Sequence, residues 1–137
     1  MRSRGKKTDL LGRIPLFAAC SGDELEAIAR VADELSLPEG RELMRQGATG
    51  RELVVIVEGE VAIERDGETI AIGRDGDFFG EMALVTGQPR NATVTANTDL
   101  RVLVLDGLSF DRLLRDVPTI AEKVQRAVAE RQPAEEA

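Results

Sequence analysis

The stretch that decides the fold runs from Gly76 to Ala96 and reads GDFFGEMALVTGQPRNATVTA. It places an acid, Glu81, nine residues before a base, Arg90, with a short apolar turn at residues 83–85 and a Gly-Gln-Pro corner between them. Arginine offers a planar fork of donors that can hold two oxygens of a phosphate, whereas lysine would supply charge without the fork. The stretch therefore suits a small ligand that carries one anionic group and one pair of sugar hydroxyls.

The same stretch matches a longer pattern, F-G-E-(L/M)-A-L followed by P-R-x-A-T-V. The matching positions are Phe79, Gly80, Glu81, Met82, Ala83, Leu84, Pro89, Arg90, Ala92, Thr93 and Val94. So many matches at fixed spacing are far more specific than a short motif. The stretch resembles the phosphate-binding cassette of cyclic nucleotide-binding domains, the sensor domains of catabolite activator-type regulators and protein kinase A regulatory subunits.

This resemblance implies a role for each charged residue of the cassette. Arg90 would hold the phosphate of a cyclic nucleotide, and Glu81 would accept a hydrogen bond from the ribose 2′-hydroxyl, since a carboxylate facing the phosphate would repel it. We expect residues 81–85 to form a short helix whose free N–H groups at Met82 and Ala83 point at the anion. The alternative is that Glu81 and Arg90 only pair with each other at the surface, where such pairs contribute about 0–1 kcal/mol.

The residues around the arginine complete the expected ligand contacts. Gly80 lacks a Cβ, so backbone can approach the sugar closely, and Pro89 and Ala92 fit the family pattern on either side of Arg90. Asn91 departs from that pattern, because this position is often Ala in cAMP-preferring members and Thr or Ser in cGMP-responsive or bacterial ones. Its amide could bond the phosphate, reach a purine edge or face solvent. Family frequency favours cAMP as the ligand, with cGMP as the alternative.

Family members often cover the base with a side chain from the last helix. Spacing from Pro118 favours Arg131 for that place, with Gln125 and Arg126 as further candidates. The alternative for each of them is a solvated side chain on an exposed helix face.

Local signals predict a mainly β fold with helices at both ends. Ser21 and Glu24 read as a capping box for a helix that runs to about Val31, preceded by a short helical segment from Asp9 to Leu11 and an apolar turn at residues 14–17. Runs at residues 53–57, 61–63, 69–72, 92–95 and 100–105 read as strands, with a two-residue hairpin signal at residues 66–67. Further helices are expected at residues 108–114 and from residue 118 to about 131.

The strand pattern predicts a closed or sandwiched β structure in which several strands are buried on both faces. The core candidates are Val55, Ile56, Val61, Ile70 and Ile72, of which one or two could line a base pocket, and Phe78 and Phe79 are expected to pack in the core. The resemblance, which covers residues 9–131, implies a cyclic nucleotide-binding β-roll, also described as a double-stranded β-helix or jelly roll. We expect residues 1–8 to form a basic flexible tail and residues 132–137 a second flexible tail.

Composition excludes several classes of function. The chain has 137 residues, a net charge of −7 and no histidine. We therefore expect one domain, no imidazole-based catalysis or metal site, no general nucleic-acid binding, no prosthetic group and no enzymatic activity. The single Cys20 is expected to be a small buried thiol, and the absence of a long apolar run or a leader-like segment favours the cytoplasm.

We predict a stand-alone cyclic nucleotide sensor that acts through movement of residues 118–131 on an unknown effector protein. The apolar stripe of that segment, which includes Ile120, Val124 and Ala127, could pair two copies in a homodimer or pack within the chain. We expect no DNA-reading helix-turn-helix in this chain, since few residues follow Val117. The competing interpretations are a ligand-free protein-interaction module on the same fold and the sensor part of a transcription regulator.

Overall fold

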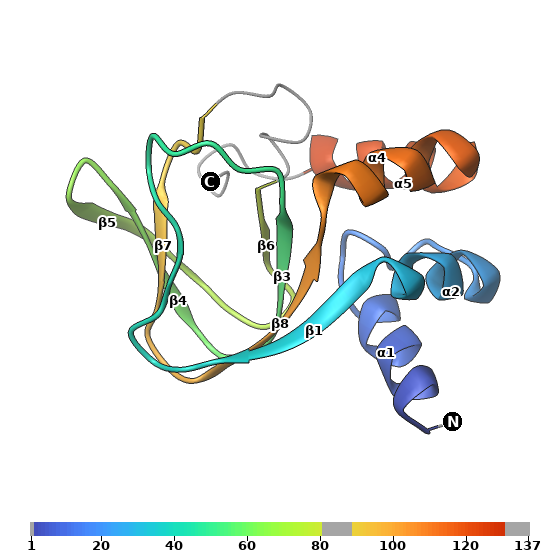
Figure 1. Ribbon diagram of the computed structural model, residues 1–137, viewed down its shortest axis with the longest axis horizontal. Helices are drawn as coiled ribbons and strands as arrows, with labels where there is room; N and C mark the ends of the chain where they lie inside the picture. Colours follow the sequence, from blue (N-terminus) through green and yellow to red (C-terminus); the bar gives the residue numbers. More distant parts are fainter. Residues whose placement is uncertain (1, 81–88, 131–137) are drawn as a thin grey trace.

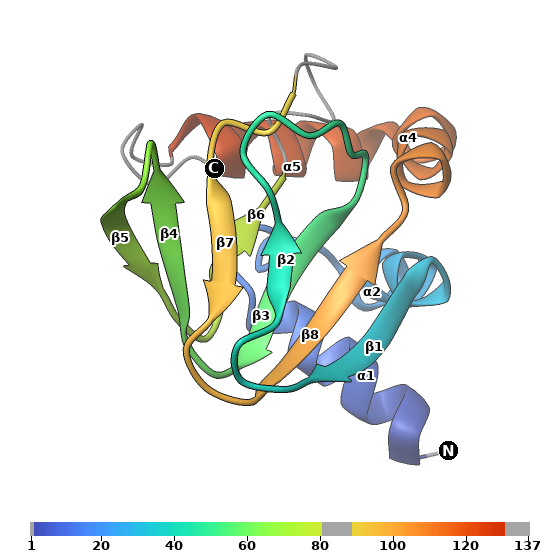
Figure 2. The same cartoon turned by 60° about the vertical axis from the view of Figure 1, so that its left-hand side comes forward.

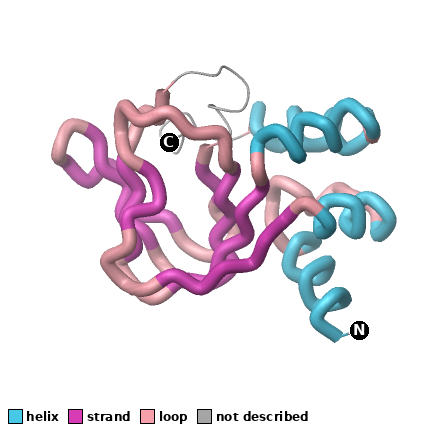
Figure 3. Tube along the Cα trace, in the orientation of Figure 1, coloured by secondary structure: helices cyan, strands magenta, loops and turns pink. Residues whose placement is uncertain are grey.

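The computed structural model describes residues 2–80 and 89–130, which form a β-roll with helices packed on one side (Figures 1 and 3). The helices are α1 (Arg2–Gly12), α2 (Gly22–Arg30), α4 (Gly107–Asp116) and α5 (Pro118–Ala129). The strands are β1 (Ala32–Leu37), β2 (Glu42–Met44), β3 (Leu53–Glu58), β4 (Val61–Arg65), β5 (Glu68–Gly73), β6 (Phe78–Phe79), β7 (Thr93–Ala96) and β8 (Leu100–Leu105). The prediction of a mainly β fold with flanking helices is confirmed.

The strands form two antiparallel sheets in the orders β1-β8-β3-β6 and β2-β7-β4-β5. In Figure 2 the second sheet faces the viewer and α5 runs behind it. The predicted hairpin joins β4 to β5, with φ of 55° at Asp66 and 83° at Gly67. A tight two-residue hairpin turn requires two positive φ values, so the Asp-Gly pair in the sequence was sufficient to predict the hairpin.

Two apolar cores hold the roll and the helices together, and β3 contributes to both. Val54 and Ile56 pack between the sheets, whereas Leu53 and Val55 pack against the helices. The prediction that some strands are buried on both faces is therefore confirmed. The apolar turn at residues 14–17 also docks as expected, because Phe17 is fully buried and its ring meets that of Phe110 edge-on at 6.3 Å between centroids.

Helix α2 begins with the predicted capping box and continues into a contact with the last helix. Ser21 Oγ accepts from the Glu24 N–H at 3.2 Å, and the Glu24 carboxylate accepts from the Ser21 N–H at 2.7 Å. The same carboxylate also accepts from Lys123 Nζ at 2.6 Å and from the Thr119 hydroxyl, both on α5. These bonds, Lys123 first, lower the pKa of Glu24 from 4.5 to about 2.

The apolar stripe of α5 packs within the chain. Ile120 is fully buried and Val124 is nearly so, in the core that includes residues of α1 and α2. Of the two interpretations of the stripe, the structure therefore favours intrachain packing, and these two side chains are not exposed for pairing with a second copy.

The structure corrects some sequence predictions. Helix α1 begins at Arg2 rather than near Asp9, although the flexibility expected of residues 1–8 stays a prediction. Val55, Ile56 and Val61 are buried as predicted, but Ile70 and Ile72 are 41% and 38% exposed. These two residues lie on β5, the edge strand of the second sheet, and the sequence carries no signal for a strand's position within a sheet.

Two further predictions concern an aromatic pair and the thiol. Phe78 and Phe79 lie in the core as expected. Cys20 is only half-buried, yet burial raises the pKa of its thiol, which disfavours the nucleophilic thiolate.

Candidate ligand-binding site

Arg90 lies just before β7, and hydrogen bonds of its backbone fix its position. Its N–H donates to the Ala48 carbonyl at 2.8 Å, and its carbonyl accepts from the Gly47 N–H at 2.8 Å. Nearby, the Gln46 N–H donates to Thr93 Oγ1 at 2.9 Å. The loop between β2 and β3 is thus paired with the segment that carries the arginine.

The guanidinium of Arg90 is buried, with a side chain only 4% exposed. Its Nη2 donates to the backbone carbonyl of Glu52 at 3.0 Å, and its Nη1 makes a longer contact of 3.4 Å with the carbonyl of Gly80. The Glu52 carboxylate adds an ion pair at 3.5 Å from Nη2. Because a buried cation is tolerated only with such partners, these oxygens fix the guanidinium between the end of β6 and the start of β3.

Two glycines make room for this side chain. A Cβ on Gly80 would lie 2.4 Å from the Glu52 carbonyl oxygen and 2.5 Å from Arg90 Nη1, and Gly80 has a φ of +100°. A Cβ on Gly50 would lie 2.8 Å from Arg90 Nη2. Sequence reasoning singled out Gly80 for close approach to a ligand, and the structure adds that the arginine itself requires the space.

A half-open cavity of about 180 Å³ adjoins Arg90. Its apolar lining comes from four strands and consists of Leu35, Leu37, Leu43, Met44, Val54, Val102 and Val104. Its charged lining consists of Arg41, Glu42, Glu52 and Arg90. A buried guanidinium beside an apolar chamber can hold a small molecule that has an anionic group and an apolar part.

The predicted site residues fall into three groups. Gly80 and Arg90 are in contact, and Ala92 is fully buried directly beyond them. Pro89 and Asn91 are exposed, and the Asn91 carbonyl accepts from Arg65 Nε at 2.9 Å. Glu81, Met82, Ala83 and Arg131, with the short helix expected at residues 81–85, lie outside the described residues.

Sequence reasoning missed Gly50 and Glu52. Both contact Arg90 but lie about 40 residues before it in a loop that carries no part of the recognised pattern. A signal for Gly50 was present only in the general density of glycines in this region.

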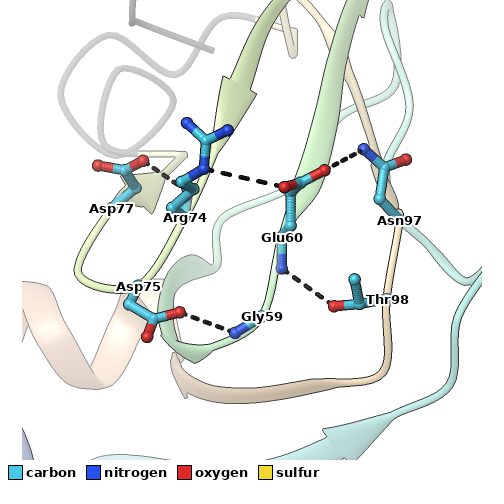
Figure 4. Close-up of polar contacts among 7 residues, drawn as sticks. All are labelled: Gly59, Glu60, Arg74, Asp75, Asp77, Asn97 and Thr98. Carbon is cyan, nitrogen blue, oxygen red and sulfur yellow. Dashed lines mark hydrogen bonds and ion pairs between the residues drawn. The ribbon is translucent and has the colours of Figure 1, made fainter.

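A second polar cluster lies at the opposite end of β7 and joins three turns (Figure 4). Asp75 Oδ1 accepts from the Gly59 N–H at 2.9 Å, and Thr98 Oγ1 accepts from the Glu60 N–H at 3.1 Å. The Glu60 carboxylate also accepts from the Asn97 amide at 3.1 Å. Because these polar groups satisfy one another's hydrogen bonds, we interpret the cluster as a structural contact that holds the three turns together at this end of the roll.

Comparisons with known proteins give relatives in sequence and in fold. A cyclic nucleotide-gated potassium channel of Rhizobium etli is 36% identical over 89% of this chain and 34% of the channel, and a cAMP-dependent protein kinase regulatory subunit of Aspergillus fumigatus is 35% identical over 84% of this chain and 28% of the subunit. The crystal structure of a cyclic nucleotide-binding domain from Methylobacillus flagellatus KT superposes with a TM-score of 0.81 at 25% identity, covering 94% of this chain and 75% of that one.

The chain spans about a third of the length of the curated relatives that it matches first. No helix in the described part of the chain is long and apolar enough to cross a membrane. Residues 34–117 match the family model described as the cyclic nucleotide-binding domain. On that match, the chain belongs to the cyclic nucleotide-binding domain family.

Proposed function

We propose that the chain is a cAMP-binding sensor in which Arg90 holds the cyclic phosphate and Glu81 the ribose. The observation that carries the proposal is the burial of the Arg90 guanidinium against fixed backbone oxygens, which presents a preorganised cation at the edge of an apolar chamber. Such a cation loses little on binding an anion, because its position is already set. The expected contacts of Gly80, Met82 and Ala83 belong to the same proposal.

The choice of cAMP over cGMP rests on family frequency, since the relatives include both a cAMP-dependent protein kinase regulatory subunit and a cGMP-dependent protein kinase. The exposed Asn91 is the position at which the chain departs from the family pattern, so it is the first candidate for tuning the base preference. We propose Arg131 as the residue that covers the base.

Ligand binding would be read out through α5. A ligand can shift this helix only if it binds one position of the helix better than another. The effector that receives the change lies in another segment or another protein, and the kinds of relatives matched make a channel, a kinase or a transcription regulator candidates.

Calorimetric titration of cAMP and cGMP into the wild type and into variants of Arg90 tests the proposal. Removing the guanidinium in Arg90→Ala deletes charge-assisted hydrogen bonds and should weaken cAMP binding by about 100-fold or more. Arg90→Lys keeps the charge and should still bind more weakly than the wild type, because the fork is lost.

The matched control is Arg45→Ala, which removes an exposed arginine that pairs only with Glu42 among the described residues. It should leave affinity unchanged, and circular dichroism should show that every variant is folded. Failure of the wild type to bind either nucleotide would refute the sensor function and favour an interaction module on the same fold.

A further inference from the structure

Glu52 places a negative charge next to the cation that would bind the ligand. Its carboxylate lies 3.5 Å from Arg90 Nη2, and its side chain is 55% exposed while that of Arg90 is 4% exposed. At 3.5 Å the contact is longer than a charge-assisted hydrogen bond, which measures about 2.7–2.9 Å. The carboxylate therefore acts on Arg90 mainly through its charge, whereas the backbone carbonyl of Glu52 supplies the short bond at 3.0 Å.

Among the described residues that line the cavity beside Arg90, two carry a positive charge and two a negative charge. Arg41 and Arg90 are positive, and Glu42 and Glu52 are negative. One negative charge on a ligand can be held by the Arg90 fork, but a second negative charge lies close to the Glu52 carboxylate, which is 3.5 Å from the same guanidinium.

We propose that Glu52 is a specificity-determining residue that admits the monoanionic phosphodiester of a cyclic nucleotide and disfavours the dianionic monoester of 5′-AMP. This inference rests on the proposed function. Discrimination here comes from repulsion of the wrong ligand, which is an effective route to specificity when two ligands share the same base and sugar.

The size of the effect follows from the distance between the charges. An anion hydrogen-bonded to the Arg90 guanidinium would lie about 7 Å from the Glu52 carboxylate. One extra unit charge at that distance changes affinity by about threefold in water-like surroundings and by about fiftyfold at an effective dielectric constant of about 20. We therefore expect discrimination of about tenfold.

The test is a titration of cAMP and of 5′-AMP into the wild type, Glu52→Gln and Glu52→Met. Both variants keep the backbone carbonyl that holds Arg90, and Met removes the charge without adding a donor. The dissociation constant of 5′-AMP divided by that of cAMP should fall about tenfold in both variants. The control Glu42→Gln removes a charge from the same cavity at a residue that pairs with Arg45, and it should change the ratio by much less.

A pH series supplies an independent measurement on the same proteins. The second ionisation of a phosphate monoester lies near pH 6, so 5′-AMP passes from dianion to monoanion between about pH 7.5 and about pH 5.5. In the wild type its binding should tighten over that range, while binding of cAMP, which stays a monoanion, should change little. In Glu52→Met the tightening should be reduced.

The outcomes separate the two claims. If the wild type binds cAMP but the nucleotide ratio and its pH dependence are the same in the Glu52 variants, the charge-selection proposal is overturned and the sensor function stands. If the wild type binds no cyclic nucleotide, the sensor function fails and this proposal fails with it.

Discussion

Replacing Glu24 by Gln should uncouple α5 from α2 at one identifiable point. The Glu24 carboxylate accepts from the Ser21 N–H, from Lys123 Nζ and from the Thr119 hydroxyl, and its side chain is only 11% exposed. Gln keeps the size of the side chain but loses the charge that makes all these bonds strong. The variant therefore measures the energy of the charge and leaves the packing of the two helices in place.

The magnitude follows from the pKa of Glu24, which the Lys123, Thr119 and Ser21 bonds lower from 4.5 to about 2. Each pKa unit corresponds to about 1.4 kcal/mol of preference for the charged form, so the shift sets an upper bound of about 3 kcal/mol. Lys123 is 28% exposed, and screening by water reduces the expected loss of stability in Glu24→Gln to about 2 kcal/mol.

Urea unfolding of the wild type and the variant at several pH values is the assay. A carboxyl group with a lowered folded-state pKa stabilises the fold fully above its unfolded pKa, near 4.5, and this stabilisation is lost as the pH falls toward 2. The difference between the two proteins should thus be largest at neutral pH and should shrink by about half or more between pH 5 and pH 3.

The control is Glu42→Gln, which breaks an exposed pair whose side chains are 72% and 39% accessible. It should lower stability by less than about 1 kcal/mol at any pH. A difference below about 0.5 kcal/mol for Glu24→Gln, or one that does not change with pH, would refute the reasoning.

Two further substitutions test the geometry around the site. Gly80→Ala should lower the free energy of unfolding by about 2 kcal/mol or more and weaken cAMP binding, because its Cβ would lie 2.4 Å from the Glu52 carbonyl oxygen at a φ of +100°; wild-type affinity and stability together would contradict the crowding argument. Asp106→Ala should lower stability by about 1 kcal/mol without changing affinity, since Asp106 caps α4 by accepting from the Ser109 N–H at 3.1 Å. Urea unfolding and calorimetry on each variant decide both, and an unchanged stability of Asp106→Ala would mean that water replaces the cap at no cost.

The features that the sequence predicted correctly are those whose cause is local. The capping box depends on two residues three positions apart, and the hairpin at residues 66–67 depends on two residues that tolerate positive φ. Strand β1 was not predicted, because its sequence ADELSL is exposed over most of its length and shows no apolar alternation. The exposure of Ile70 and Ile72 was missed for a related reason, since edge position is a property of the assembled sheet.

The site residues also divide into those with a local sequence signal and those without one. The pattern around residues 79–94 predicts the type of ligand group and the arginine proposed to bind it, because the motif is continuous in sequence. The carboxylate of Glu52 lies 38 residues before Arg90 and the amine of Lys123 lies 99 residues after Glu24. Pairs at such separations are set by the pairing of the loop between β2 and β3 with the segment before β7, and by the meeting of α2 with α5, which a single sequence does not encode in any local pattern.

The hydrogen bonds between Glu24 on α2 and residues of α5 limit how ligand binding could move these helices. If binding at Arg90 shifts α5, the two bonds that Lys123 and Thr119 donate to Glu24 must either break or carry α2 along with the helix. Breaking them would cost about 2 kcal/mol, a roughly thirtyfold loss in apparent affinity. Moving α2 with α5 keeps these bonds, and both helices then shift against the first-sheet strands that share their apolar core. The cost of breaking these bonds therefore favours α2 and α5 moving as one unit against the roll. On that basis Glu24→Gln should change the stability of the fold far more than its affinity for cAMP. A thirtyfold gain in the affinity of the variant would show instead that the bonds between Glu24 and α5 break when the ligand binds.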